Sequence, residues 1–491
     1  MTQFKYKLRL FFGGGKMYFR ILEKIIYRKY TDYGYITDNS MFGYQFLNEK
    51  RLLPGERYIS ESGSYMMNCL SKQPKHIDDI INELLTIFEG VEFDELKEDT
   101  FNFYMQFVNE GFLAFGRTKE ECINYTAAEK ASKIFENAEH NFDDKNNITL
   151  DNINFLRSVH IEIVNECNER CVHCYIPHDK KNKILDSNLF YKILEESRKL
   201  NIIHITISGG EPLLHKDFIP FLRKCRELDL SVNVLSNLTL LNDAIIEEMK
   251  ENPLLSVQTS IYSMNPVVHD SITQRFGSFE LTKSAILKLI KAGIPVQISC
   301  PIMKQNKNDF ATVKEWGESN NISVLFDYVI FAAYDHSNCN LSHRLSLEEI
   351  ENAFDSQLSI EYVNSLKETA GEKESLTQED PICSICKHFF CVSAEGNIYP
   401  CVGWQSKVVG NIKNNSIKEL WEDSLELNRL RSIKWKDFPK CISCENRGYC
   451  TVCMMSNANE SPDGDIFNIE KFHCQVACVK REKVNKFLSK L

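Results

Sequence analysis

The chain has 491 residues, of which 43% are hydrophobic, and this is enough to bury the cores of roughly two to four domains. Its formal net charge of −10 provides no general basic surface, which argues against a protein that binds nucleic acid. No apolar run reaches the roughly 20 residues of a membrane span, and the start is too short in apolar residues for a secretory signal. We therefore expect a cytoplasmic protein.

The first predicted module spans residues 17–125. Met17 is a candidate for the true first residue, because the preceding Phe-Phe-Gly-Gly-Gly-Lys could be encoded by a purine-rich ribosome-binding site. Short β-like segments at 33–37, 44–49 and 56–60 are followed by helical patterns at 76–88 and 99–111 and by a short strand at 112–115. Gly111 is a plausible helix stop. Strands, three helices and a closing strand predict a small winged-helix module.

A polar segment at 126–152 is predicted to be a linker, and residues 153–365 follow it with a different pattern. Six β-branched runs alternate there with amphipathic helical patterns. Such βα units in series predict an α/β fold in which a parallel sheet closes partly into a barrel, with its active face at the carboxyl ends of the strands. The six predicted strands lie at 159–164, 203–208, 231–236, 256–261, 296–300 and 324–330.

The chain contains 18 cysteines, and without a secretory signal they do not indicate a disulfide framework. Grouped cysteines in a reducing compartment indicate metal. Five scattered cysteines are interpreted as small buried hydrophobic residues, namely Cys69, Cys122, Cys225, Cys300 and Cys339. The others form three groups: Cys167, Cys171 and Cys174; then Cys383, Cys386, Cys391 and Cys401; then Cys441, Cys444, Cys450, Cys453, Cys474 and Cys478.

The first group, in the sequence CNERCVHCY, directly follows the first predicted strand of the barrel. Three thiolates can hold three irons of a [4Fe–4S] cluster and leave the fourth iron open to another ligand. The sequence SGGEP at 208–212 ends the second predicted strand. Its glycines would let a ligand approach the backbone, and Glu211 could receive a ligand's ammonium group.

With these two motifs, residues 155–365 resemble the radical S-adenosylmethionine (SAM) superfamily. The resemblance implies that Cys167, Cys171 and Cys174 hold a [4Fe–4S] cluster whose open iron is chelated by the amino and carboxylate groups of SAM. It also implies reductive cleavage of SAM to methionine and a 5′-deoxyadenosyl radical, which takes a hydrogen atom from the substrate.

The resemblance further implies a set of SAM-binding residues at the strand ends. The glycine pair and Glu211 match the family's SAM-amine motif, and the Ser-Asn pair ending the third strand matches a ribose or carboxylate contact. Ser260 matches a contact to the SAM carboxylate, although the family's SLDG reads SIYS here, and Tyr175 matches the aromatic residue beside the adenine. His173 is interpreted as an ordinary intervening residue. The complete set is Tyr175, Gly209, Gly210, Glu211, Ser236, Asn237 and Ser260.

Residues 366–491 form the last predicted domain, and about 380–478 resemble the SPASM extension of radical SAM enzymes, which holds two auxiliary iron–sulfur clusters. The spacing departs from the family once, with two residues instead of three between Cys450 and Cys453. Zinc is the alternative metal, because paired CxxC motifs also suit a tetrahedral zinc site. The resemblance implies Cys383, Cys386, Cys401 and Cys453 as ligands of the first auxiliary cluster and Cys441, Cys444, Cys450 and Cys474 as ligands of the second, with Cys391 and Cys478 in surplus.

The N-terminal module resembles the RiPP recognition element, a winged-helix fold that binds the leader of a ribosomally made precursor peptide. The segments 54–70 and 109–115 carry this resemblance. It implies that the leader is added as a strand to an exposed sheet edge. A winged helix that binds DNA is the alternative.

Together these resemblances predict a radical SAM peptide maturase with SAM, three [4Fe–4S] clusters and a reductant protein such as flavodoxin or ferredoxin. The predicted product is a thioether crosslink from a Cys sulfur to a carbon of the core peptide, as in sactipeptide and ranthipeptide enzymes. A carbon–carbon crosslink, an epimerisation and a sulfatase-maturase-like activity are alternatives, and an iron–sulfur or zinc winged-helix regulator is the non-enzymatic one. Sulfatase maturases lack the N-terminal module and commonly have an Asp base where Val402 stands. The sequence assigns no catalytic base.

Overall fold

The computed structural model describes residues 16–47, 54–125, 156–180 and 182–490. The chain divides into two compact units. Unit 1 comprises residues 1–43 and 49–152, and unit 2 comprises residues 44–48 and 153–491. The predicted linker at 126–152 lies outside the described residues. No helix in the described part of the chain is long and apolar enough to span a membrane.

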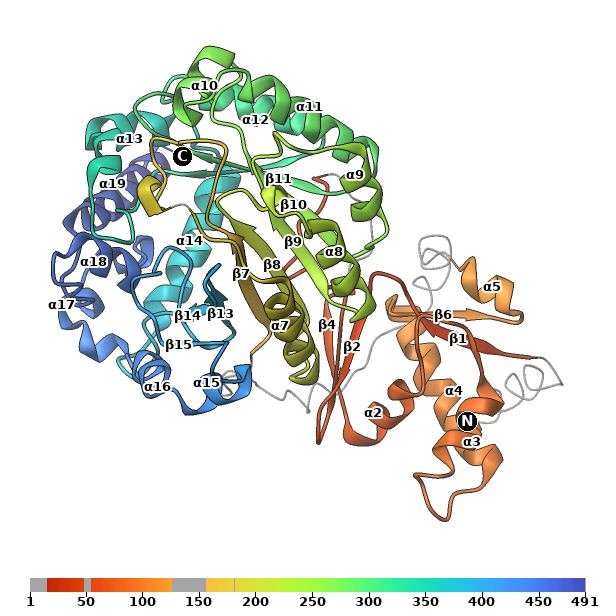
Figure 1. Cartoon of the computed structure of the whole chain (residues 1–491). Coiled ribbons are helices and arrows are strands. Elements are labelled where there is room, and N and C mark those ends of the chain that lie inside the picture. Colours follow the sequence, from red (N-terminus) through yellow and green to blue (C-terminus); the bar gives the residue numbers. More distant parts are fainter. Residues whose placement is uncertain (1–15, 48–53, 126–155, 181, 491) are drawn as a thin grey trace. The chain divides into compact units, whose positions relative to one another are not determined.

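Unit 1 contains two three-stranded sheets (Figure 1). In the first, the central strand β1 pairs antiparallel with β5 and β6, and in the second β3 pairs antiparallel with β2 and β4. Within the described residues, β4 pairs with β3 alone, so its other edge has no strand partner. The strands are β1 (Tyr18–Ile21), β2 (Ile26–Lys29), β3 (Gly34–Thr37), β4 (Glu56–Ile59), β5 (Lys75–His76) and β6 (Leu113–Gly116).

Unit 1 contains four helices among the described residues, and the second and third of them lie at the two helical patterns predicted at 76–88 and 99–111. Ser60 caps the first, because its hydroxyl accepts a hydrogen bond from the Gly63 N–H. The third ends at Gly111, whose φ of 89° is left-handed and suits glycine, which confirms the predicted stop. The assignment of unit 1 to a winged-helix recognition module stays a prediction. The helices are α2 (Glu61–Asn68), α3 (Ile77–Leu84), α4 (Phe93–Glu110) and α5 (Lys119–Ile123).

The predicted strand at 44–49 is wrong for its described part, because Tyr44–Leu47 forms no strand. Both edges of β3 are already occupied by β2 and β4, so this segment has no edge of β3 left to pair with. Instead it belongs to unit 2, where the Tyr44 N–H donates to Oγ of Ser256 at 3.1 Å. The strands β1 and β2 were not anticipated from the sequence, because runs of four residues are too short for alternation to be distinctive.

A nine-stranded sheet runs through unit 2 in the order β12-β11-β10-β9-β8-β7-β13-β14-β15. Its six strands from β7 to β12 are all parallel and lie at the six predicted positions. This confirms the predicted α/β class and is consistent with a partial barrel (Figure 1). The six strands are β7 (Ser158–Val164), β8 (His204–Gly209), β9 (Ser231–Leu235), β10 (Leu255–Ser260), β11 (Val296–Pro301) and β12 (Ser323–Asp327).

The helices between these strands cover the outside of the curved sheet (Figure 1). The rings of Phe190 and Phe221, on two neighbouring helices, stack with their centroids 3.9 Å apart in the apolar core. The connecting helices are α7 (Ser187–Lys199), α8 (Phe218–Glu227), α9 (Asp243–Lys250), α10 (Pro266–Thr273), α11 (Ser278–Lys291) and α12 (Phe310–Ser319), with short 3₁₀ turns η3 (His178–Lys180) and η4 (Pro212–Leu214).

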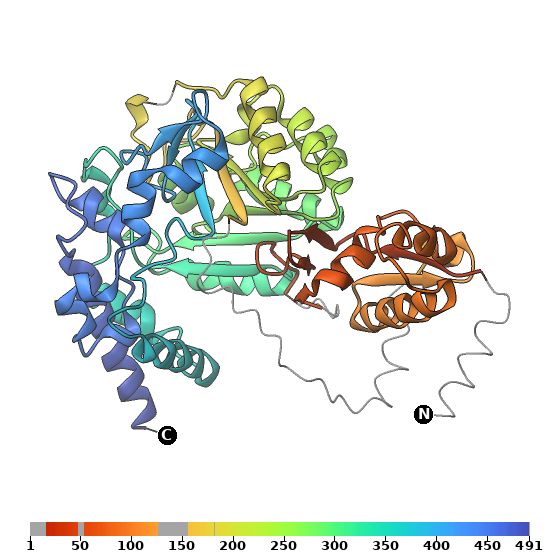
Figure 2. The same cartoon turned by 90° about the horizontal axis from the view of Figure 1, so that it is seen from below.

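The C-terminal region extends the same sheet. Strand β13 (Phe389–Val392) pairs parallel with β7, and β14 (Asn397–Tyr399) and β15 (Gly410–Asn411) follow in antiparallel order (Figure 2). The predicted barrel and SPASM regions therefore share one compact unit. The remaining elements are η5 (Cys339–His343), α13 (Leu347–Asp355), α14 (Ile360–Ser375), α15 (Ile417–Asp423), α16 (Leu425–Arg431), η6 (Trp435–Asp437), α17 (Pro439–Ile442), η7 (Arg447–Tyr449), α18 (Met454–Glu460) and α19 (Lys471–Leu488).

Strand β7 is buried on both faces, as expected for a central parallel strand. Val159, Ile161 and Ile163 alternate along one face and belong to the apolar core. His160 and Glu162 alternate with them and are also buried. Two buried polar side chains on one face of a central strand mark that face as a candidate for function.

Candidate active site at the carboxyl ends of the parallel strands

A cavity of about 370 Å³ lies at the carboxyl ends of the parallel strands, and we name it the thiol cavity. Cys167, Cys171 and Cys174 all line it, and none of them is in a disulfide. Cys171 interacts electrostatically with the other two thiols. Three soft donors on one loop, facing a cavity, fit a [4Fe–4S] cluster that keeps one open iron. Their role as ligands remains a prediction.

Backbone hydrogen bonds fix the loop that carries these cysteines. The N–H groups of Arg170 and Val172 donate to the carbonyls of Thr273 and Ile272, each at 3.0 Å, which ties the loop to the end of α10. The Cys174 N–H closes a turn onto the Cys171 carbonyl at 3.1 Å. The loop is therefore held in place by the barrel itself.

Gly209 and Gly210 line the thiol cavity, but the structure shows a further reason for glycine at both positions. A Cβ on Gly209 would lie 1.9 Å from the Val164 carbonyl oxygen, and one on Gly210 would lie 2.2 Å from the Glu166 carbonyl oxygen. The Gly210 N–H also donates to Val164 at 2.7 Å. The end of β8 therefore packs directly on the backbone that leads into the cysteine loop, and only glycine leaves room for this approach.

Glu211 is fully buried and does not line the thiol cavity. Its carboxyl group accepts hydrogen bonds from Oγ of Ser236 at 2.7 Å and from the N–H groups of Asn237 at 2.8 Å and Leu213 at 2.9 Å. Burial raises the pKa of this carboxyl to about 7, while the three donors lower it. Here Glu211 joins the ends of β8 and β9, and its predicted contact with the SAM amine remains a prediction.

The other predicted SAM-binding residues all line the thiol cavity: Tyr175, Ser236, Asn237 and Ser260. Hydrogen bonds fix the position of Asn237. Its side-chain amide donates to Oδ1 of Asn168 at 2.7 Å, and its backbone carbonyl accepts from Oγ1 of Thr282 at 2.8 Å. The structure therefore brings six of the seven predicted SAM-binding residues to one cavity. The seventh, Glu211, does not line it.

His173 lines the same cavity, and burial lowers its pKa to about 4, so the imidazole is neutral. Its Nε2 lies 3.4 Å from the Tyr262 hydroxyl. Tyr262 stands within the SIYS sequence and was not predicted as a cavity residue, nor was His160, whose ring hydrogen-bonds Oγ of Ser208. The sequence does contain an indication for His160, because burying a polar side chain in a central strand is unfavourable unless the side chain has a partner or a function.

The C-terminal cysteines assemble into two groups of four. Cys401 interacts electrostatically with Cys453, Cys383 and Cys386. The second group is Cys441 with Cys450, Cys474 and Cys444. Each group offers four thiols, which fits a fully ligated iron–sulfur cluster and equally fits the donor number of a structural zinc site. The assignment of these eight cysteines as ligands remains a proposal.

The two surplus cysteines differ in their surroundings. Cys391 is fully buried and interacts electrostatically with Cys401 and Cys386, so it lies beside the first group. Cys478 lies on α19, and its thiol donates to Oε1 of Glu482 at 3.4 Å.

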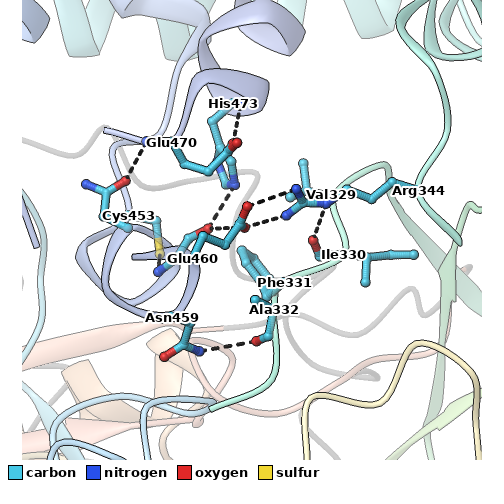
Figure 3. Close-up of polar contacts among 12 residues, drawn as sticks. Val329, Ile330, Phe331, Ala332, Arg344, Cys453, Asn459, Glu460, Glu470 and His473 are labelled. Carbon is cyan, nitrogen blue, oxygen red and sulfur yellow. Dashed lines mark hydrogen bonds and ion pairs between the residues drawn. The ribbon is translucent and has the colours of Figure 1, made fainter. Parts of the chain in front are cut away.

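Helix α18 connects the first four-thiol group to the wall of the thiol cavity (Figure 3). Cys453 caps this helix, and at its other end the Glu460 carboxylate receives both terminal nitrogens of Arg344, at 3.0 and 2.5 Å. The Nε of Arg344 donates to the carbonyl of Ile330, a residue lining the cavity, at 2.7 Å. Glu460 lies close to Glu470 and His473. Because its carboxylate already forms an ion pair with Arg344, this cluster is better explained by that pair than by a metal site.

Comparison with known proteins identifies two domains. Residues 161–317 match the family model of the radical SAM superfamily, and residues 383–453 match that of SPASM, an iron–sulfur cluster-binding domain. The chain is 23% identical over 328 residues to a PqqA peptide cyclase of Bradyrhizobium diazoefficiens, covering 62% of this chain and 82% of the relative. It is 25% identical over 320 residues to an AdoMet-dependent heme synthase of Methanosarcina barkeri, covering 60% and 89%.

Solved structures share the fold. Streptococcus suis SuiB bound to its precursor peptide SuiA superposes with a TM-score of 0.59 at 14% identity, covering 92% of this chain and 98% of SuiB. The enzyme anSMEcpe with bound AdoMet and a peptide superposes with a TM-score of 0.52 at 17% identity, covering 68% and 98%. The two family matches give the cofactors as SAM with a [4Fe–4S] cluster in the barrel and auxiliary iron–sulfur clusters in the SPASM domain.

Replacing Arg344 with Ala should destabilise unit 2 by about 3–5 kcal/mol, because it leaves the Glu460 carboxylate, whose side chain is only 10% exposed, without its cation. Urea denaturation measures this change. The matched control is Lys250→Ala, which removes an exposed ion pair with Glu247 and should change stability by less than about 1 kcal/mol. Equal effects of the two substitutions would contradict the structural role of the Arg344–Glu460 pair.

Proposed function

We propose that this member of the radical SAM superfamily, which carries a SPASM iron–sulfur domain, matures a ribosomally made precursor peptide by installing a radical-derived crosslink. The position of Tyr175 carries the proposal. Tyr175 lines the thiol cavity and interacts electrostatically with Cys174 and with Cys401. The thiol cavity and the first four-thiol group are therefore neighbours. An oxidative crosslink needs such proximity, because an electron must leave the substrate after the hydrogen atom is removed.

When bound, SAM and the iron–sulfur clusters supply the radical and the electron transfer. The chain supplies position and shelter. Gly209 and Gly210 dock the cysteine loop on β8, and Ser236 and Asn237 present polar groups to the cavity. Apolar side chains, including Phe331, complete the wall and exclude water from a reactive intermediate.

Two findings support a peptide substrate. One relative is named for cyclising a peptide, and SuiB was solved with a precursor peptide. The SuiB superposition covers 92% of this chain, a larger share than unit 2 alone, so the fold likeness reaches into unit 1. The anSMEcpe superposition covers 68%. A module beyond the catalytic unit favours a maturase that recognises a leader over a sulfatase-maturase-like enzyme.

One edge of β4 pairs with β3 and the other carries no strand of the described residues, which supports leader binding by unit 1. An extended peptide can add to such an edge through its backbone groups, with alternate side chains facing the protein. Arg57 of β4 forms an ion pair with Glu110 at the end of α4, with Nε and Oε2 3.3 Å apart. A leader strand along β4 would therefore lie near α4, where side chains of the helix can select among sequences.

For the product we propose a thioether from a Cys sulfur to a carbon of the core peptide, with a flavodoxin or ferredoxin as electron donor. A carbon–carbon crosslink is the second candidate, since a relative carries the name of a peptide cyclase. Epimerisation at Cα is the third.

Anaerobically reconstituted protein should contain about 12 Fe per chain, because eleven cysteines would hold three clusters. Replacing Cys167, Cys171 and Cys174 together with Ala should lower this to about 8 Fe and abolish release of 5′-deoxyadenosine. The control Cys225→Ala, on the far side of the barrel wall in α8, should leave both unchanged. Iron analysis near four Fe, or stoichiometric zinc, would contradict the proposed clusters.

Binding of the precursor peptide should slow amide hydrogen exchange in β4, because the leader would pair with the edge of β4 opposite β3. Exchange measured by mass spectrometry on the full chain tests this. The central strand β3 is the internal control, since both of its edges are already paired. Protection confined to other parts of the chain would place the leader elsewhere.

Turnover of a Cys-bearing precursor should give a product lighter by two hydrogens that no longer reacts with a thiol-alkylating reagent. A thioether consumes the thiol, whereas a carbon–carbon crosslink gives the same mass loss and keeps the thiol reactive. An unchanged mass with a new D-residue would indicate epimerisation instead.

A further inference from the structure

Unit 2 contains a second cavity, of about 500 Å³, that the proposed chemistry does not use. Residues from β7, from the hairpin of β13 and β14 and from the segment after the cysteine loop line it. No cysteine lines it, so the iron–sulfur clusters do not occupy it. We name it the carboxyl cavity after Glu162, which lines it.

Glu162 is 1% exposed and has little to balance its charge. The side-chain amide of Gln405 donates to Oε2. The Tyr399 hydroxyl faces the carboxyl group closely enough to lower its pKa. In the described part of the chain, however, neither this hydroxyl nor Oε1 has a partner at full hydrogen-bonding geometry. No lysine or arginine of the described residues forms an ion pair with Glu162. A buried carboxyl group with an unused oxygen is costly, which indicates a partner that the chain does not supply.

The other charged residues around this cavity are mainly acidic. Asp179 and Glu395 line it together with Glu162. Among the described residues of the lining, Lys183 is the one basic residue, and its Nζ lies 3.9 Å from Oε1 of Glu395. Both of these side chains are about half exposed, so Lys183 neutralises the rim and leaves the buried carboxyl group unpaired. The cavity therefore attracts a cation.

We propose that the carboxyl cavity binds a primary ammonium group, which the free oxygen of Glu162 receives as an ion pair. Asn165 and Asn397 also line the cavity. Their Oδ1 atoms already accept from the Lys183 N–H at 2.6 Å and from the Asn411 amide at 2.8 Å, and an amide oxygen has a second lone pair with which it can accept another donor. If the proposed function holds, the ammonium belongs to the precursor peptide, either as a lysine side chain or as an amino terminus. A volume of about 500 Å³ accommodates one such residue with adjoining backbone.

The position of the carboxyl cavity suggests how this ion pair would orient a substrate. Tyr175 lines the thiol cavity, and its hydroxyl also interacts electrostatically with Glu162. Tyr175 therefore lies near both the thiol cavity and the Glu162 carboxyl group. A substrate anchored by its ammonium at Glu162 would extend past Tyr175 toward the three thiols, so Glu162 would set which carbon is presented there.

The protonation of Glu162 makes binding depend on pH. Burial raises the pKa of this carboxyl to about 7, and the groups that face it are Tyr175, Tyr334, Tyr399 and Cys391. Burial raises the pKa of each of these groups as well, so all four are neutral at pH 7 and none is a cation. Because an ammonium binds the ionised carboxylate, its affinity should rise as the pH increases through about 7.

Titration calorimetry on the anaerobically reconstituted full chain tests the proposal with three small probes. They are Nα-acetyl-lysine methylamide, alanine methylamide with a free amino group, and uncharged Nα-acetyl-norleucine methylamide. At least one ammonium probe should bind about tenfold or more tightly than the norleucine probe. Binding of the first alone identifies a side-chain ammonium, and binding of the second alone identifies an amino terminus. Equal affinity for all three, or no binding of either cation, would overturn the proposal.

Substitution then locates the site. Glu162→Gln keeps the shape and removes the charge, and it should lower the affinity of the ammonium probe about tenfold and abolish its rise between pH 6 and 8. Glu368→Gln, an exposed position on α14, is the matched control and should change neither. An unchanged affinity in Glu162→Gln would overturn the proposal. If that variant does not fold, the probe comparison and the pH series on the unaltered chain still decide. No probe requires a precursor, so a failure of peptide maturation would contradict the proposed function and leave this result standing.

Discussion

The pairing of β7 on both of its edges is the constraint on which the two cysteine-rich regions depend. Its register with β8 places the three-cysteine loop beside the glycine pair, and its register with β13 places Cys391 opposite His160. Tyr399 of β14 in turn stands opposite Cys391. Because side chains alternate with a period of two, a slip of one residue would exchange the polar inner set for the apolar outer one. The sheet therefore aligns both regions at once.

Close backbone contacts convert this alignment into a rigid platform. The Val164 and Glu166 carbonyls of the chain leaving β7 accept from Gly210 and Glu211 at the end of β8. The Glu211 carboxyl then accepts from the residues that end β9. Three successive strand ends are thus tied by hydrogen bonds before any ligand binds. Such preorganisation suits a site that must hold a reactive species in one geometry.

Three carboxyl groups in unit 2 that are buried or nearly so differ in how their charge is balanced. Glu460 is paired with Arg344. Glu211 has no such pair but accepts three hydrogen bonds from nearby donors. Glu162 keeps one oxygen without a partner among the described residues and faces a cavity. The first two arrangements stabilise the fold. In the third, the free-energy cost of burying the carboxyl group is not offset by the chain, which is typical of a group that binds a ligand.

The sequence alone determined the order of the parallel strands, the position of the cysteine loop and the spacing of the cysteine groups, because alternation, helical periodicity and ligand spacing are local properties of a chain. It did not reveal β13 as a seventh parallel strand, since pairing across more than 200 residues leaves no local signal. From the sequence, the glycine pair was explained by the close approach of a ligand. In the structure, the atoms that a Cβ at these two positions would meet first belong to the backbone of Val164 and Glu166. Only the tertiary structure decided that Glu211 lies behind the cavity wall and that Glu162 faces a cavity of its own, because burial and missing partners depend on every strand and loop packed around a side chain.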